Sequence, residues 1–132
     1  MGVTDDLKRV PLFSDLDEKQ LRKLGEHFRE RNLAEGTSVV QEGTMSGVGF
    51  FVVAEGEASV TKGGSEVATL GPGDHFGELA LINERERSAT VTATTAVRAL
   101  EIPFWDFRDF AHANPDVTWK LLQHVVEMLG PA

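Results

Sequence analysis

Between residues 31 and 102 the chain consists of short apolar stretches separated by turns rich in glycine. Short stretches with turns at regular spacing predict an antiparallel β-sandwich or a small β-barrel. Gly63-Gly64 is a strong signal for a two-residue hairpin, and residues 71–74 (Gly-Pro-Gly-Asp) predict a second turn. The strands expected from this pattern are residues 37–41, 49–54, 57–62, 66–70, 90–93 and 97–102.

Helical patterns flank this region on both sides. Apolar residues recur every three to four positions from residue 5 to 28, and Ser14 or Asp15 is the expected cap of the run that begins near Asp17. Beyond Pro103, one helix is expected over the phenylalanines of residues 104–111. A second is expected to begin at Pro115, because proline suits a first helical turn, and to end at Gly130-Pro131.

The expected architecture is therefore mainly β with flanking helices, an α+β fold in a single domain, residues 1–132. It has an N-terminal helical part (residues 1–30), a small antiparallel β-barrel (31–102) and two C-terminal helices (103–130). At 132 residues the chain is long enough for one well-buried core.

Composition excludes several classes of function. The net charge of −8 argues against nucleic-acid binding by this segment, which would need a basic patch. The chain has no cysteine, which excludes disulfides, thiolate catalysis and cysteine-ligated metals. It shows neither an apolar run of about 20 residues nor the basic and apolar regions of a signal peptide, so we expect no membrane contact and a cytoplasmic location.

Residues 76–90 (FGELALINERERSAT) contain the groups needed to bind a ribose phosphate. Gly77 lets the backbone approach a ligand, and a short helix after it would present free N–H groups to phosphate. Arg87 offers a planar charged fork, and Glu78 can accept a hydrogen bond from a sugar hydroxyl. Alternatively, Arg87 pairs with a neighbouring glutamate at the surface and Glu78 caps the helix. Alternation along a strand would point Arg85 the same way as Arg87, so spacing alone does not separate them.

This segment resembles the phosphate-binding cassette of the cyclic nucleotide-binding domain family, F-G-E-[LI]-[AGS]-[LM] followed after a short loop by R-[AST]-[AT]. Glu86 stands where many members have proline. The resemblance extends over about residues 12–129 and implies a jelly-roll-like form of the barrel. The matching residues are Phe76, Gly77, Glu78, Leu79, Ala80, Leu81, Arg87, Ser88 and Ala89, together with the turn glycines Gly36, Gly43, Gly56, Gly71 and Gly73.

The resemblance implies a regulatory sensor whose ligand is a cyclic nucleotide monophosphate, with no further cofactor. It assigns the phosphate to Arg87 and to the backbone amides of Gly77, Leu79 and Ala80. It assigns the ribose 2′-hydroxyl to Glu78, and gives Ser88 a hydroxyl for the phosphate or the base. The string Glu-Arg-Ser-Ala is similar to activator-type members, which favours cAMP over cGMP.

The base would be covered by barrel residues and by the last helix, which would act as a lid and relay. Core packing is nevertheless the expected role of each apolar candidate on that helix. The resemblance also allows for an effector domain, fused or separate, and for a homodimer. A domain excised from a longer regulator is expected slightly more than a stand-alone sensor. The helix candidates are Trp119, Leu121, Leu122, Val125 and Met128.

Two rival functions remain. A metal-dependent barrel enzyme needs clustered histidines, but His27, His75, His112 and His124 are scattered and only His75 lies in the barrel region. No catalytic residue and no metal ligand is therefore predicted. The other rival is a degenerate member of the family that binds a partner protein instead of a ligand. Such a loss should remove Glu78 or Arg87, and the chain has both.

Overall fold

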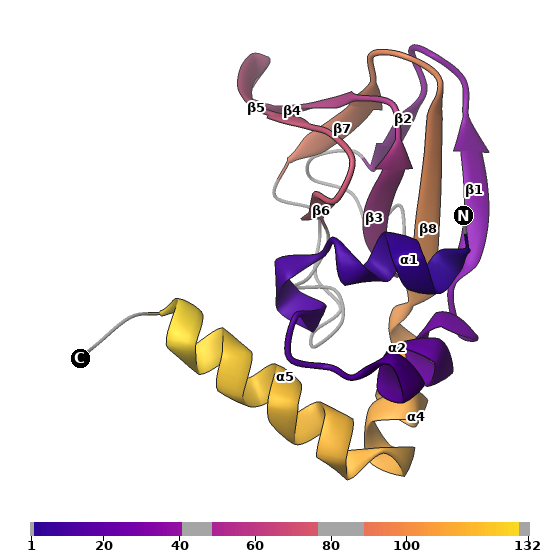
Figure 1. Ribbon diagram of the computed structural model, residues 1–132. Coiled ribbons are helices and arrows are strands. Elements are labelled where there is room, and N and C mark those ends of the chain that lie inside the picture. The colour runs from indigo at the N-terminus through magenta and orange to yellow at the C-terminus, as the bar shows by residue number, and fades with distance from the viewer. Residues whose placement is uncertain (1, 41–48, 77–88, 130–132) are drawn as a thin grey trace.

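The computed structural model describes residues 2–40, 49–76 and 89–129 of the chain. In this part, eight strands form two separate four-stranded antiparallel sheets, a jelly-roll-like sandwich rather than a closed barrel (Figure 1). Sheet A has the order β1-β8-β3-β6 and sheet B the order β2-β7-β4-β5. The strands are β1 Arg29–Leu33, β2 Ser38–Val40, β3 Gly49–Glu55, β4 Ala58–Lys62, β5 Ser65–Leu70, β6 His75–Phe76, β7 Thr90–Ala93 and β8 Val97–Pro103.

The expected mainly β architecture with flanking helices is confirmed, but two strands were not predicted. Strand β1 has the sequence Arg-Glu-Arg-Asn-Leu, in which only Leu33 is buried, so it lacks apolar alternation. Strand β6 has only two residues. Both are strands because they pair with buried partners, β8 and β3 respectively.

Both predicted turns are confirmed. Strands β4 and β5 form a hairpin in which Gly63 and Gly64 have φ angles of 57° and 82°, as a type I′ turn requires. In the second turn, the Asp74 amide donates to the Gly71 carbonyl at 3.0 Å. The Gly71 amide donates to the Asp74 carboxylate at 2.8 Å.

The helices gather at one end of the sandwich and along sheet A (Figure 1). Both C-terminal helices lie where they were expected, and Pro115 opens the second. None of the described helices combines the length and the apolar character needed to cross a membrane. The helices are α1 Val3–Lys8, the short 3₁₀ helix η1 Pro11–Phe13, α2 Glu18–Gly25, α4 Phe104–Ala113 and α5 Pro115–Met128.

The predicted cap of the N-terminal run was wrong. Helix α2 begins after Asp17, whose carboxylate accepts from the Gln20 amide at 2.8 Å. The Gln20 side chain accepts from the Asp17 amide at 3.0 Å, so the two residues form a capping box. Neither Ser14 nor Asp15 caps the helix, because Ser14 follows the 3₁₀ turn that begins at Pro11.

Alternation along sheet A divides the core in two. Phe50 and Val52 face the helices, where Phe50 makes edge-to-face contacts with Phe13 and Phe28. Phe51 and Val53 face the interior between the sheets. Each face of the central strand β3 is therefore buried, which explains its uninterrupted apolar sequence.

Candidate functional site

All six residues predicted to bind the ligand lie in segment 77–88, outside the described residues. The described ends of this segment are nevertheless informative. On one side it follows strand β6 of sheet A, and on the other it leads into strand β7 of sheet B. The segment therefore joins the two layers of the sandwich. The six residues are Gly77, Glu78, Leu79, Ala80, Arg87 and Ser88.

Phe76 anchors the first end of this segment. Its ring stacks on Phe51, with centroids 4.9 Å apart and ring planes 6° from parallel. Phe51 is completely buried, and the two residues are directly opposed in the pairing of β3 with β6. The backbone that leads into Gly77 is thus fixed to the core by an aromatic contact and by strand pairing.

Strand β7 anchors the other end. It pairs with β4 over four positions, from Thr61↔Thr90 to Ala58↔Ala93, and with β2 on its other side. Val91 and Ala93 are buried between the sheets. The chain that follows the segment therefore enters an inner strand of sheet B, which fixes its position at this end.

Between these two ends, four apolar side chains pack against the buried interior but remain partly exposed. They belong to both sheets and to different strands, and only Phe76 among them was part of a sequence motif. Half-buried aliphatic and aromatic groups of this kind suit a planar, largely apolar ligand. These residues are Val39, Val60, Leu70 and Phe76.

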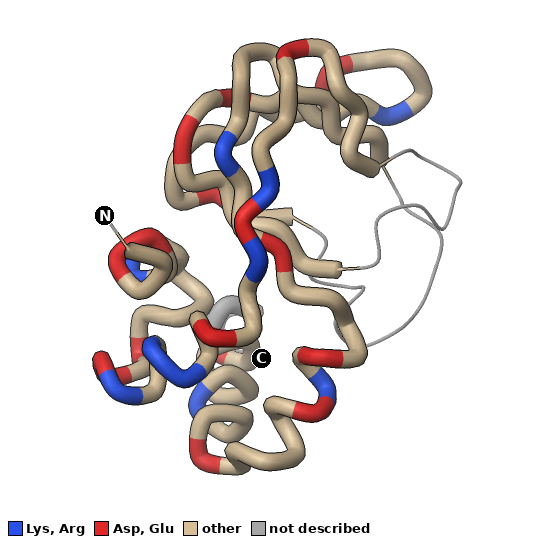
Figure 2. The backbone as a smooth tube through the Cα atoms, turned by 90° about the vertical axis from the view of Figure 1, so that its right-hand side faces the viewer, with Lys and Arg blue, Asp and Glu red and all other residues tan. Residues whose placement is uncertain are grey.

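A charged cluster lies on the face of sheet A that also carries Phe51 and Phe76. The buried carboxylate of Glu101 is 3.1 Å from the Arg31 guanidinium and 3.7 Å from that of Arg29. Two arginines sharing one carboxylate leave one positive charge in excess, within a chain of net charge −8. Figure 2 shows basic and acidic residues alternating along β1. Nothing in the sequence pattern indicated this cluster, because β1 was not predicted as a strand.

Strand pairing links the charged cluster to the predicted site. Arg29 is opposite Glu101, Glu101 is opposite Phe51, and Phe51 is opposite Phe76. Residues directly opposed on paired strands share one face of the sheet. Three strand spacings, about 14 Å, therefore separate the arginine edge from the start of the predicted phosphate-binding segment.

Arg98 forms a second cluster, on the opposite face of β8. Its guanidinium binds the carboxylates of Asp6, Glu30 and Glu55, joining α1, β1 and β3. The hydrogen bond to Glu55, followed by those to Asp6 and Glu30, raises the pKa of Arg98 above its ordinary value. Arg98 therefore holds α1 to the sheet and has little capacity left for an anion.

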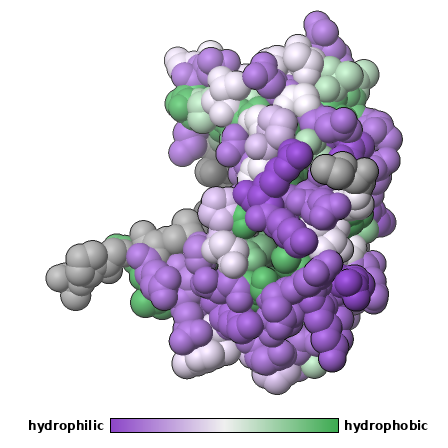
Figure 3. All heavy atoms as spheres, in the orientation of Figure 1, coloured by the Kyte–Doolittle hydropathy of each residue, from purple (hydrophilic) through white to green (hydrophobic). Residues whose placement is uncertain are grey.

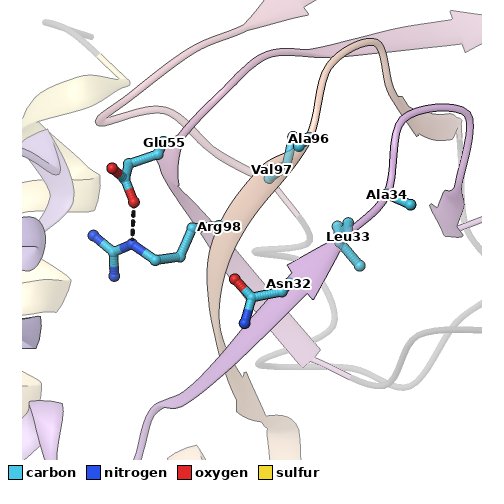
Figure 4. A pocket seen from close by; sticks show the side chains of 7 residues that line it. All are labelled: Asn32, Leu33, Ala34, Glu55, Ala96, Val97 and Arg98. Carbon is cyan, nitrogen blue, oxygen red and sulfur yellow. Dashed lines mark hydrogen bonds and ion pairs between the residues drawn. The ribbon is translucent and has the colours of Figure 1, made fainter.

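A pocket of about 390 Å³ lies beside Arg98, between β1 and the loop that precedes β8 (Figure 4). All of its described lining residues belong to β1, β3, β8 and the adjoining loops. The Glu55 carboxylate stands at its edge, bonded to Arg98, and would repel a phosphate. We therefore do not assign the ligand to this pocket. It is lined by Asn32, Leu33, Ala34, Glu55, Ala96, Val97 and Arg98.

The apolar residues of helix α5 divide into two groups. Leu121 is buried in the core beside the helices, as expected. Core packing was the wrong expectation for Trp119, Leu122 and Val125, which are 61%, 51% and 42% exposed. With Val126 and Leu129, they give α5 an exposed apolar surface near the C-terminal end (Figure 3). The side chain of Met128 lies outside the described part of the structure.

The two antiparallel sheets and their flanking helices together define a jelly-roll-like β-sandwich domain. The family model "Cyclic nucleotide-binding domain" matches residues 30–114. This match covers more than half of the chain, which therefore belongs to the cyclic nucleotide-binding domain family.

Relatives of known role agree with this assignment. A cAMP-dependent protein kinase regulatory subunit of Yarrowia lipolytica is 46% identical over 94 residues, which are 70% of this chain and 25% of the subunit. The chain thus spans about a quarter of that relative's length.

Solved structures agree as well. The N-terminal domain of a transcriptional regulator from Streptomyces coelicolor A3(2) superposes with a TM-score of 0.87 at 33% identity, covering 95% of this chain and 90% of that domain. The regulatory domain of Toxoplasma gondii PKA, crystallised with cAMP, gives a TM-score of 0.72 at 34% identity, covering 81% of this chain and 42% of that chain.

Proposed function

We propose that this chain is a cytoplasmic regulatory sensor that binds a cyclic nucleotide monophosphate, with cAMP preferred to cGMP. One observation carries the proposal: residues 76–90 have the sequence of the family's phosphate-binding cassette, and their described ends lie in opposite sheets. The relative crystallised with cAMP supports the choice of ligand. The domain would then sense a ligand rather than catalyse a reaction.

In this proposal Arg87 binds the two exocyclic phosphate oxygens with parallel hydrogen bonds. Each charge-assisted bond of this kind contributes about 1.5–3 kcal/mol. The amides of Gly77, Leu79 and Ala80 add backbone donors, and Ser88 adds a hydroxyl. The Arg29–Glu101–Arg31 cluster supports the proposal, because it adds positive charge to the same face of sheet A. That contribution is modest, since Arg29 is largely exposed to screening salt.

Glu78 is proposed to accept a hydrogen bond from the ribose 2′-hydroxyl. A carboxylate beside a phosphate is unfavourable unless it has a donor of its own. The hydroxyl and the Arg87 guanidinium together would provide such donors. This role makes the site selective for a ribonucleotide over its 2′-deoxy analogue.

The base is proposed to lie against Val39, Val60, Leu70 and Phe76, with α5 as a movable cover and relay. The exposed side chains of Trp119 and Leu122 support this role, because they are apolar surface without a cover in the described structure. A ligand shifts such a helix only through its different affinity for two positions. The same surface is also available for a homodimer or an effector domain.

Calorimetric titration of the 132-residue chain with cAMP, cGMP and 2′-deoxy-cAMP tests the proposal. We expect saturable binding with one site per chain, tightest for cAMP and weaker for the deoxy analogue. The Glu78→Gln variant should lose most of the discrimination against the deoxy analogue while retaining binding. A chain that binds none of the three nucleotides would instead support the degenerate, partner-binding interpretation.

A further inference from the structure

The fold brings one histidine together with two carboxylates that are distant in the sequence. His124 and Glu127 lie on helix α5, and Asp15 lies in the turn between η1 and α2. The ligand atoms of the three side chains lie within 4.8 Å of one another. His124 Nδ1 is 3.4 Å from a carboxylate oxygen of Asp15. Scattered histidines argued against a metal site in the sequence, but the fold supplies partners for this one.

The arrangement of the donors suits a metal ion. Residues three positions apart on a helix share a face, so His124 and Glu127 point to the same side of α5. One imidazole nitrogen and two carboxylate oxygens form a donor set that borderline divalent cations accept, Zn²⁺ among them. Tetrahedral zinc bonds of about 2.0–2.2 Å place two donors roughly 3.4 Å apart. His124 and Asp15 already have this spacing, whereas donors nearer the 4.8 Å limit of the group must move closer. The side chains of Asp15 and Glu127 are exposed and can make this adjustment, whereas His124 is only 15% exposed and holds its place.

Charge also favours a cation over a simple ion pair. A protonated His124 would neutralise only Asp15. Among the described residues the Glu127 carboxylate makes no ion pair, since His124 pairs with Asp15 alone. A divalent cation would neutralise both carboxylates at once.

We propose that Asp15, His124 and Glu127 form a binding site for a borderline divalent cation, with Zn²⁺ as the first candidate and water completing the coordination. The bound ion would link α5 to the segment that precedes α2. It would therefore favour the position of α5 described above, independently of any nucleotide.

Calorimetric titration of the metal-free 132-residue chain with Zn²⁺ tests the site. We expect one equivalent of Zn²⁺ to bind, and no binding of Mg²⁺, which prefers an all-oxygen environment. His124→Ala should abolish the binding, and Asp15→Asn and Glu127→Gln should each weaken it by about tenfold or more. The two carboxylate changes affect exposed side chains and should leave the fold intact. His112→Ala is the matched control, because His112 is an exposed helical histidine outside the cluster.

Thermal unfolding provides a second readout. Zn²⁺ should raise the melting temperature of the wild-type chain and of His112→Ala, because a ligand that binds only the folded state stabilises it. At the same Zn²⁺ concentration the rise should be absent in His124→Ala and smaller in Asp15→Asn and Glu127→Gln. Wild-type protein that binds no Zn²⁺, or His124→Ala protein that binds it as tightly as wild type, would overturn the proposal. Neither measurement involves a cyclic nucleotide, so the proposed metal site can be disproved without affecting the proposed nucleotide site.

Discussion

The ring of Phe76 lies flat against the ring of Phe51, 4.9 Å away, at the point where sheet A leads into the predicted phosphate-binding segment. Phe51 belongs to the central strand of the sheet and is fully buried. Phe76 thus transmits the rigidity of the core to the backbone immediately before Gly77. This contact ties the stability of the sandwich to the geometry of the site.

We therefore predict that Phe76→Ala weakens both folding and nucleotide binding. Loss of the half-buried ring and of its stacking should lower the free energy of unfolding by about 2–3 kcal/mol. Affinity should fall as well, because the amides that follow would no longer be pre-positioned. Urea unfolding and calorimetry measure the two effects. Phe76→Leu is the control: it keeps apolar volume and should retain most of the stability, and an unchanged affinity in Phe76→Ala would contradict the anchoring role.

Gly56, in the turn between β3 and β4, tests the backbone conformation of the sandwich. Its φ angle is 92°, and an added Cβ would lie 2.2 Å from the carbonyl oxygen of Ala96. Gly36 has a similar φ of 89°, but nothing lies within 4 Å of its added Cβ. Gly36→Ala should therefore cost only the backbone strain, about 1–2 kcal/mol, and Gly56→Ala clearly more. Equal losses in urea unfolding of the two variants would show that the space around Gly56 relaxes.

The buried pair of Arg98 with Asp6 predicts a double-mutant result. Asp6 is only 3% exposed, so Arg98→Leu would leave its carboxylate buried without a cationic partner. The free energy of unfolding should fall by about 2–4 kcal/mol, somewhat below the loss for a fully buried pair, because Arg98 is 21% exposed. Adding Asp6→Asn removes the unpaired charge and should recover part of this loss. A double variant as unstable as the sum of the two single variants would exclude the coupling.

Local sequence signals predicted much of the fold. Gly63-Gly64 fixed a hairpin because both residues need positive φ, and Pro115 marked a helix start because proline suits the first turn. The two missed strands have no such local signal. Arg29 and Arg31 are in a strand only because β8 pairs with them, and Phe76 because β3 does. Long-range pairing therefore decided what local periodicity could not.

The residues of the candidate site show the same contrast between local and long-range signals. Arg87 and Glu78 were identified from a contiguous motif, and their roles remain predictions. Val39 and Leu70 pack against one core cluster only in the folded sandwich, and Glu101 likewise meets Arg31 there, from strands far apart in the sequence. The apolar spacing on α5 was misinterpreted as core for Trp119, because periodicity gives the direction of a side chain but not whether another element covers it.

Arg87 is predicted to hold the phosphate, and Arg85 is its natural control. Arg87→Ala should weaken cyclic nucleotide binding by about 2–5 kcal/mol, because a desolvated anion would lose its charged partner. Arg85→Ala removes the same charge two residues earlier in the chain and should change affinity by less than about 1 kcal/mol. Calorimetry of both variants at one salt concentration makes the comparison. Near-wild-type binding by Arg87→Ala would remove Arg87 from the site, and a large loss in Arg85→Ala would assign the role to that residue.

The proposed movement of α5 can be followed through its own tryptophan. Trp119 is 61% exposed on α5, and the chain's other tryptophan, Trp105 on α4, is 42% exposed. In a Trp105→Phe variant all tryptophan fluorescence comes from Trp119, so its quenching by acrylamide reports the exposure of α5 alone. If α5 moves over a bound nucleotide, saturating cAMP should reduce this quenching, because the indole becomes shielded from solvent. The converse variant, Trp119→Phe, should show a smaller change, since Trp105 lies outside the proposed cover. Calorimetric binding without any change at Trp119 would mean that the domain binds its ligand with α5 in place, and the relay would have to be sought in another element.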